Sequence, residues 1–144
     1  KNIYNGLVQV DPENKGYYTQ NKEEYLNQLD KLDSDIEKTL SGYENRSFMV
    51  FHPTWGYFAQ EYGLNMIHVE SGGKEPSAKE LQRFIDIAIE KNISVIFVQE
   101  QFSKSSAESI ANEVNGEVIS VDPLARDYVS NLRNVSELFA ENLG

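Results

Sequence analysis

Apolar residues recur at helical spacing through the first third of the chain. Asp11 followed by Pro12 is typical of a helix start, because aspartate caps a first turn and proline fits the first helical position. Apolar side chains then follow at steps of three, four or seven: Tyr18, Tyr25, Leu29, Leu32, Ile36 and Leu40. They predict one face of a single long helix that ends before Gly42. A helix of about 28 residues would be about 42 Å long, which suits a spine that connects two parts of a protein.

After this helix the pattern changes to short apolar runs that alternate with amphipathic segments. Strands are predicted at 47–51, 64–69, 94–98 and 117–121, and helices at about 54–62, 77–91, 104–114 and 126–142. Such alternation predicts an α/β fold, with a four-stranded parallel sheet covered by helices on both faces. The chain therefore divides into a long backbone helix, residues 1–45, and an α/β unit, residues 46–144.

The helix predicted at 77–91 carries the clearest local signals. Ser77 and Glu80 form a capping-box sequence, and Ser105 and Glu108 repeat it at the next helix. The apolar stripe expected to face the sheet consists of Leu81, Phe84, Ile85, Ala88 and Ile89. Aromatic residues of the helix at about 54–62 are expected to form core and cleft wall: Trp55, Tyr57 and Phe58.

Ligands of an open parallel sheet bind beyond the carboxyl ends of its strands. The first predicted strand ends at His52 and the fourth at Asp122. An imidazole with a carboxylate suits Zn²⁺, Mn²⁺ or Fe²⁺, and zinc favours nitrogen donors. Both residues are therefore candidate metal ligands, although a zinc site needs about four. Each also has a plain structural alternative: His52 as a strand-end histidine with one hydrogen bond, and Asp122 as a helix N-cap before Pro123.

Other chemistries have weaker signals. Ser103 could join His52 and Asp122 as nucleophile, base and orienting acid, but no Gly-x-Ser-x-Gly elbow is present. Gly72-Gly73-Lys74 resembles a fragment of a phosphate-binding loop, but without the complete motif it is better interpreted as a turn. His68 lies inside a predicted strand and is interpreted as a structural or surface histidine. An enzyme is thus disfavoured, while an α/β regulatory or small-ligand-binding domain without metal stays open as an alternative.

Composition narrows the choice of partners. The 144 residues are 40% hydrophobic and 25% charged, as in a globular domain, and the formal net charge of −10 argues against nucleic acid. Cysteine is absent, which excludes disulfides and thiolate metal sites in this sequence. The sequence carries no signal peptide or lipid-attachment cysteine and opens at Lys1 without an initiator methionine, so we expect a processed product or an excised piece.

Several segments, taken together and in order, resemble one family. They are His52-Pro53-x-Trp55-Gly56-Tyr57-Phe58, Lys74-Glu75-Pro76-Ser77-Ala78-Lys79-Glu80-Leu81, Val95-Ile96-Phe97-Val98-Gln99-x-Gln101-Phe102-Ser103 and Val121-Asp122-Pro123-Leu124. These look like the C-terminal half of the zinc-binding solute receptors of ATP-binding-cassette importers, the zinc/manganese periplasmic-binding-protein family. The helix that begins at Asp11 is similar to that family's backbone helix, which joins two lobes.

The resemblance implies a function and a site. His52 would be the first metal ligand of the C-terminal lobe and Asp122 its carboxylate ligand. Members tuned to manganese usually carry glutamate in place of His52, so zinc is the expected metal. The complete protein would capture zinc outside the cytoplasmic membrane, in the periplasm or as a lipid-anchored surface protein. It would deliver the metal to the membrane permease of the importer, without enzymatic activity.

The family's N-terminal lobe, which supplies two further histidines, has no counterpart in this sequence. The resemblance therefore implies half of a metal site. Glu100 and Gln101 are candidates for orienting the ligands of this half. In the isolated chain, we expect the backbone helix to face solvent in part or to be covered by another copy, forming a homodimer.

Overall fold

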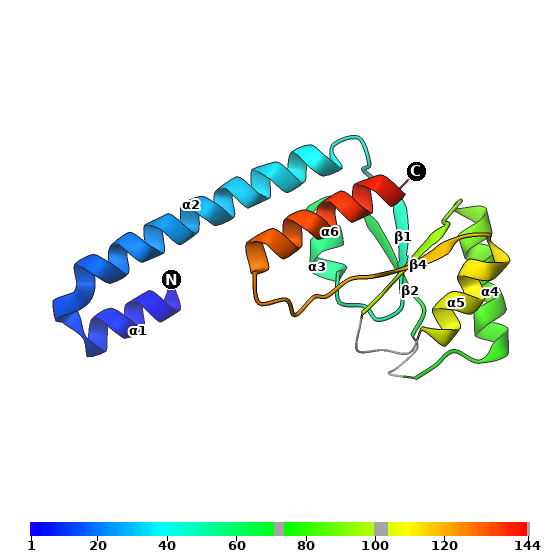
Figure 1. Cartoon of the computed structure of the whole chain (residues 1–144), viewed down its shortest axis with the longest axis horizontal. Helices are drawn as coiled ribbons and strands as arrows, with labels where there is room; N and C mark the ends of the chain where they lie inside the picture. Colours follow the sequence, from blue (N-terminus) through cyan, green and yellow to red (C-terminus); the bar gives the residue numbers. More distant parts are fainter. Residues whose placement is uncertain (71–73, 100–103, 144) are drawn as a thin grey trace.

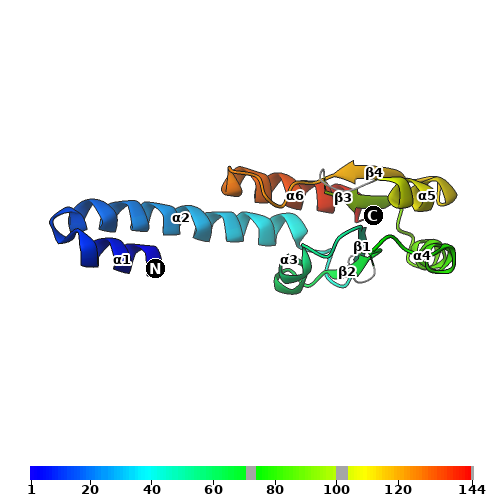
Figure 2. The same ribbon diagram turned by 90° about the horizontal axis from the view of Figure 1, so that it is seen from below.

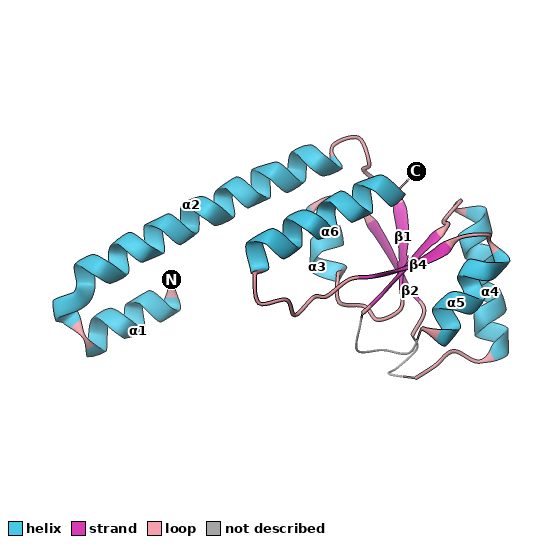
Figure 3. Cartoon of the chain, viewed as in Figure 1, coloured by secondary structure: helices cyan, strands magenta, loops and turns pink. Residues whose placement is uncertain are grey.

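The structure is a computed structural model, and it describes residues 1–70, 74–99 and 104–143. The elements in chain order are α1 (Asn2–Val10), η1 (Pro12–Asn14), α2 (Lys15–Leu40), β1 (Ser47–Val50), α3 (Gly56–Glu61), β2 (Asn65–His68), α4 (Ala78–Glu90), β3 (Val95–Val98), α5 (Ser105–Glu113), β4 (Glu117–Ser120) and α6 (Tyr128–Asn142) (Figure 3). None of the helices within the described residues has both the length and the apolar character needed to cross a bilayer.

The four strands form one parallel sheet in the order β2-β1-β3-β4. Helices α4 and α5 lie on one face, and α3, α6 and the end of α2 lie on the other (Figure 1). Alternation along β1 divides its side chains between two cores, with Phe48 and Val50 facing α6 and with Met49 and Phe51 facing α4 and α5. The predicted α/β class, with a four-stranded parallel sheet covered on both faces, is confirmed.

The capping box at the start of α4 is confirmed. The Glu80 backbone N–H donates to Ser77 Oγ, and the Ser77 backbone N–H donates to Glu80 Oε2 at 2.8 Å. The Ser77 hydroxyl also donates to Glu80 Oε2 at 2.6 Å, and this bond, followed by the one from the Ser77 backbone N–H, lowers the pKa of the Glu80 carboxyl. The capping box predicted at Ser105 is wrong, because α5 begins at Ser105 itself and its N-cap position is Lys104, which makes no side-chain capping bond.

Three predicted core positions lie closer to the surface than expected. Ile89 is 63% exposed and Tyr57 is 91% exposed, so neither belongs to the core. Phe84 packs against the α4–α5 core but is only half-buried. The reason is that the apolar face of α4 is narrow: Ile85 and Ala88 meet the sheet, and the residues at the edges of the stripe remain in contact with solvent.

The long helix predicted from Asp11 is present as the short 3₁₀ turn η1 followed by α2, and an additional helix that the sequence analysis did not predict comes before it. Residues Asn2–Val10 already form α1, which turns back at Asp11 and lies beside α2 (Figures 1 and 2). The Asp11 carboxylate accepts hydrogen bonds from Asn14 Nδ2 at 2.8 Å and from the Tyr18 hydroxyl at 2.7 Å. The two bonds lower the pKa of Asp11, with the Asn14 bond the larger cause, and they stabilise the turn between the helices.

Helix α2 is anchored to the sheet only through its C-terminal half. Leu32, Ile36 and Leu40 are buried in the same core as Phe48 and Phe139. Two carboxylates of α2 add polar anchors: Asp35 accepts from Arg133 of α6 at 3.1 Å, and Asp33 accepts from the Tyr62 hydroxyl at 2.8 Å. The N-terminal half of α2 and all of α1 extend away from the sheet (Figure 1).

Gly116 marks a close approach between the turns before β3 and β4. A Cβ atom at this position would lie 1.8 Å from the Ser94 carbonyl oxygen, which is itself held by the Glu117 backbone N–H at 2.9 Å. Gly116→Ala should therefore lower the free energy of unfolding by about 1–3 kcal/mol, because backbone has to move. Gly16→Ala is the matched control, since nothing lies within 4 Å of its added Cβ in α2. It should be neutral or stabilise by up to about 1 kcal/mol. Equal urea midpoints for both variants would contradict this account.

Candidate metal site at the carboxyl ends of the strands

His52 follows β1 at the edge of the sheet where all four strands end. The Phe51 backbone N–H still donates to Phe97 of β3 at 2.9 Å, and the chain then leaves the sheet at Pro53, which has no N–H to donate. The Thr54 backbone N–H donates to the His52 carbonyl at 2.9 Å and closes a tight turn. The imidazole is thus carried on a short, hydrogen-bonded turn at the end of a central strand.

Glu70 is the partner of this imidazole. Strands β1 and β2 pair with Val50 opposite His68, and the ladder continues beyond the strands, because the Glu70 backbone N–H donates to the Phe51 carbonyl at 3.0 Å. This pairing brings Glu70 beside His52, and His52 Nδ1 contacts Glu70 Oε2 as a hydrogen bond or ion pair. The His52 side chain is 34% exposed, whereas that of Glu70 is only 8% exposed.

A second buried polar residue holds the same turn from the other side. Gln99, which follows β3, is 6% exposed, and its Nε2 donates to Thr54 Oγ1 at 2.6 Å. The ends of β1, β2 and β3 are therefore joined by side-chain contacts at Glu70, His52, Thr54 and Gln99. This network fixes the turn that carries His52.

Asp122 stands at the end of β4. The Val121 backbone N–H donates to Val98 at 2.9 Å, so the pairing with β3 extends to the residue before Asp122. Its Oδ1 accepts from the Leu124 backbone N–H at 2.9 Å, which closes an Asx-type turn. The alternative in which Asp122 is the N-cap of the last helix is wrong, because α6 begins at Tyr128 and is capped by Asp127.

His52 and Asp122 lie at the same edge but not at adjacent strands. Because β3 separates β1 from β4, the two strand ends are about 9–10 Å apart, twice the spacing of paired strands. Both side chains would have to reach over the end of β3 to share one ion. In the described part of the chain, no group of three or more His, Asp or Glu side chains converges to hold a metal. The structure therefore brings His52 together with Glu70 and leaves the pairing of His52 with Asp122 as a prediction.

The remaining candidates divide between described and undescribed residues. Five of the residues considered in the sequence analysis lie outside the described residues: Gly72, Gly73, Glu100, Gln101 and Ser103. His68 is the exposed last residue of β2, which agrees with its interpretation as a surface histidine. Of the aromatic residues after His52, Trp55 is buried and Phe58 packs against it at a ring-centroid distance of 6.0 Å. Glu70 is the site residue that the sequence analysis did not single out, although it follows its strand at the same distance as His52 follows β1.

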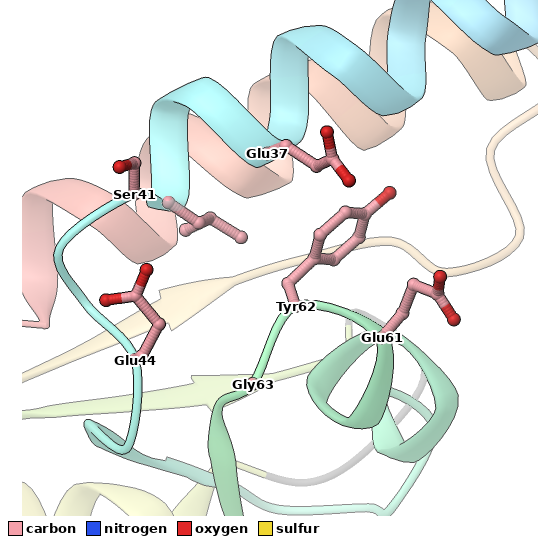
Figure 4. Close-up of a pocket in the computed structure, with 7 residues that line it drawn as sticks. Glu37, Ser41, Glu44, Glu61, Tyr62 and Gly63 are labelled. Atoms are coloured by element: carbon pink, nitrogen blue, oxygen red, sulfur yellow. The ribbon is translucent and has the colours of Figure 1, made fainter.

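An acidic pocket lies at the opposite edge of the sheet. It is lined by residues from the end of α2, from the loop before β1 and from the end of α3: Glu37, Leu40, Ser41, Glu44, Glu61, Tyr62 and Gly63 (Figure 4). Burial, followed by the hydrogen bond to Asp33, raises the pKa of the Tyr62 hydroxyl. The pocket lies where β1 and β2 begin, so it is separate from the edge that carries His52.

A parallel sheet covered by helices, with a supported histidine at the carboxyl ends of its strands, is typical of an α/β ligand-binding protein. Residues 1–142 match the family described as zinc-uptake complex component A, periplasmic, and the chain belongs to that family. The resemblance found in the sequence is confirmed. The family is one of transport components, so the prediction that the chain is not an enzyme is also confirmed.

Individual relatives agree with this assignment. The chain is 37% identical over 116 residues to the high-affinity zinc uptake system protein ZnuA of Bacillus subtilis, a match that covers 79% of this chain and 36% of that protein. It is 30% identical over 126 residues to the zinc-binding protein AdcA of Streptococcus pyogenes, covering 86% of this chain and 24% of that protein.

Solved structures extend the comparison to the whole chain. A crystal structure of ZnuA is 40% identical and superposes with a TM-score of 0.95, covering 99% of this chain and 56% of that one. The laminin-binding protein Lmb of Streptococcus agalactiae, at 24% identity and a TM-score of 0.88, shares the fold. The chain spans 56% and 58% of these two solved structures, and its matches cover 36% and 24% of these two curated relatives.

Proposed function

We propose that this chain is the C-terminal lobe, with its backbone helix, of an extracytoplasmic receptor that captures zinc for an ATP-binding-cassette importer. The observation that carries the proposal is His52, a histidine held through the buried residues Glu70 and Gln99 at the carboxyl edge of the sheet. Residues 1–142 of the same chain match a zinc-uptake family. The permease of the importer is the proposed recipient of the metal. Location outside the cytoplasmic membrane follows from the same family assignment.

Zinc is the proposed cargo because of the donor at the site. Imidazole nitrogen is a preferred zinc ligand, whereas manganese favours oxygen donors. We assign His52 and Asp122 as the two ligands from this lobe, with the remaining ligands supplied by the other lobe. Asp122 would contribute through its carboxylate from the end of β4.

The N-terminal half of α2, which extends away from the sheet, supports the presence of another lobe. Together with α1 it forms an apolar groove, whose lining includes Ile3, Leu7, Tyr17, Tyr25 and Leu29. Ile3 is 81% exposed and Tyr17 is 66% exposed. Apolar surface of this kind is usually covered by a partner. We propose that the rest of the complete protein covers it, and that in the isolated chain a second copy would take its place.

Zinc titration in the presence of a competing chelator tests the proposal. The complete protein should bind one zinc ion tightly, and the isolated 144-residue chain should bind it much more weakly, because half of the ligands are missing. Equal affinities would contradict the half-site. The absence of zinc binding by the complete protein would contradict the function itself.

The role of Asp122 is tested by Asp122→Asn in the complete protein. Asparagine also forms Asx turns, so the bond to the Leu124 backbone N–H is retained while the charge is lost. If Asp122 is a ligand, the variant should bind zinc more weakly. Asp30→Asn, on the exposed surface of α2, is the matched control for the loss of one negative charge. Identical affinities of the two variants would make Asp122 a turn residue only.

A further inference from the structure

The most informative feature beyond the proposed ligands is the buried carboxylate of Glu70. Burying a carboxylate costs free energy unless a donor or a positive charge compensates it. The compensating group in the described structure is Nδ1 of His52. Glu70 has no place among the ligands proposed above, so its burial next to His52 needs an explanation of its own.

The geometry points to a positioning role: we propose that Glu70 holds His52 with its proton on Nδ1, so that Nε2 carries the lone pair that binds zinc. A neutral imidazole has one donor and one acceptor nitrogen, and an ionised carboxylate can only accept. The nitrogen that contacts Glu70 must therefore carry the proton. Carboxylate–histidine–metal arrangements use such a contact to fix the tautomer and the ring orientation, and to raise the basicity of the ligand.

The backbone holds Glu70 at a fixed position beside His52. The β1–β2 ladder continues through the Glu70 backbone N–H, which donates to Phe51 at 3.0 Å, so Glu70 is fixed relative to the residue before His52. The turn after His52 is fixed separately by Gln99 through Thr54. One main-chain bond and one side-chain bond therefore fix the backbone on either side of His52, and the Glu70 carboxylate sets how the imidazole ring is rotated. This inference rests on the proposed zinc function, since it concerns the orientation of a proposed ligand.

The first measurement is the tautomer of His52 in the metal-free complete protein, by ¹⁵N-resolved NMR above the ordinary imidazole pKa of about 6.5. We expect Nδ1 to carry the proton in the wild type, with His68 as the internal reference because it is the other histidine of this chain. Glu70→Ala should shift His52 towards the tautomer with the proton on Nε2. A wild-type protein that already has its proton on Nε2 would overturn the proposal without any variant.

The second measurement is zinc affinity. Glu70→Ala should weaken binding about 10–100-fold, the usual effect of removing a partner of a metal-bound histidine. Glu70→Gln keeps an acceptor oxygen and nearly the same shape, so it should recover part of the loss and should also fold if the alanine variant does not. Glu90→Ala, at the exposed end of α4, is the control for charge and should bind as the wild type does.

The outcomes separate this proposal from the function on which it rests. If His52→Ala abolishes tight binding but a folded Glu70→Ala retains both affinity and tautomer, the positioning role is wrong and the zinc function stands. If Glu70→Gln loses as much affinity as His52→Ala, Glu70 is itself a ligand and the proposal fails. If the wild-type complete protein does not bind zinc, the proposed function fails first.

Discussion

Replacing His52 by alanine in the complete protein should lower its zinc affinity by more than about 100-fold. Loss of a residue that merely supports a metal ligand costs about 10–100-fold, and loss of the ligand itself should exceed that range. His52 is the histidine of this chain that stands at the carboxyl edge of the sheet in contact with a buried carboxylate. Titration against a chelator of known affinity measures the change.

The control for this variant is His68→Ala. His68 is the other histidine of the chain and lies two residues before Glu70, at the exposed end of β2. Its loss removes one imidazole from the same edge of the sheet, but not the proposed ligand, so zinc affinity should stay within a few-fold of the wild type. An equal loss from both variants would mean that neither acts as a specific ligand.

The largest effect on stability should come from Phe139→Ala in α6. Phe139 is completely buried, and its ring centroid lies 4.6 Å from that of Phe48 and 4.7 Å from that of Phe97. The rings of Phe58 and Trp55 lie within 5.6 and 5.8 Å. Removing a ring from the centre of this cluster leaves a cavity and should cost about 3–5 kcal/mol. Chemical unfolding followed by circular dichroism measures the loss.

Phe84→Ala in α4 is the comparison variant. Phe84 would approach the same cost if it were fully buried, but it is half-buried, so its loss should be clearly smaller than that of Phe139. The two substitutions remove the same side chain from opposite faces of the sheet. A larger loss at Phe84 would show that the distribution of core packing between the two faces is wrong.

The strand–helix order was predictable because the buried strands are continuous apolar runs, such as Val95–Val98, separated by amphipathic helices. Helix α1 was missed although Ile3, Leu7 and Val10 have helical spacing. The Asp11-Pro12 pair is a strong signal for the start of a helix. Another helix that ends at the same place was therefore not considered. The turn back at Asp11 depends on contacts with Asn14 and Tyr18, which local pattern does not reveal.

The candidate site was predictable in part. A rule about strand ends was enough to single out His52, because it needs only the position where an apolar run stops. The role of Glu70 was not predictable in this way, because it depends on β1 and β2 being neighbours in a particular register, which a single sequence does not specify. The separation of Asp122 from His52 was not predictable for the same reason, because the strand order places β3 between them.

Because α2 is anchored through its C-terminal half, a small tilt at that half gives a larger displacement at its N-terminal end. Beyond Leu32, its nearest buried anchor, the helix continues for about 17 residues, or about 25 Å, towards Lys15. A tilt of about 5° at the anchored end would displace the far end by about 2 Å over that length. Metal–ligand distances tolerate only about 0.2 Å. If the other lobe rests on the N-terminal half of α2 as proposed, the ion pair between Asp35 and Arg133 helps to set the tilt of α2. It would thereby affect the distance between the metal ligands of the two lobes, although it lies away from the site.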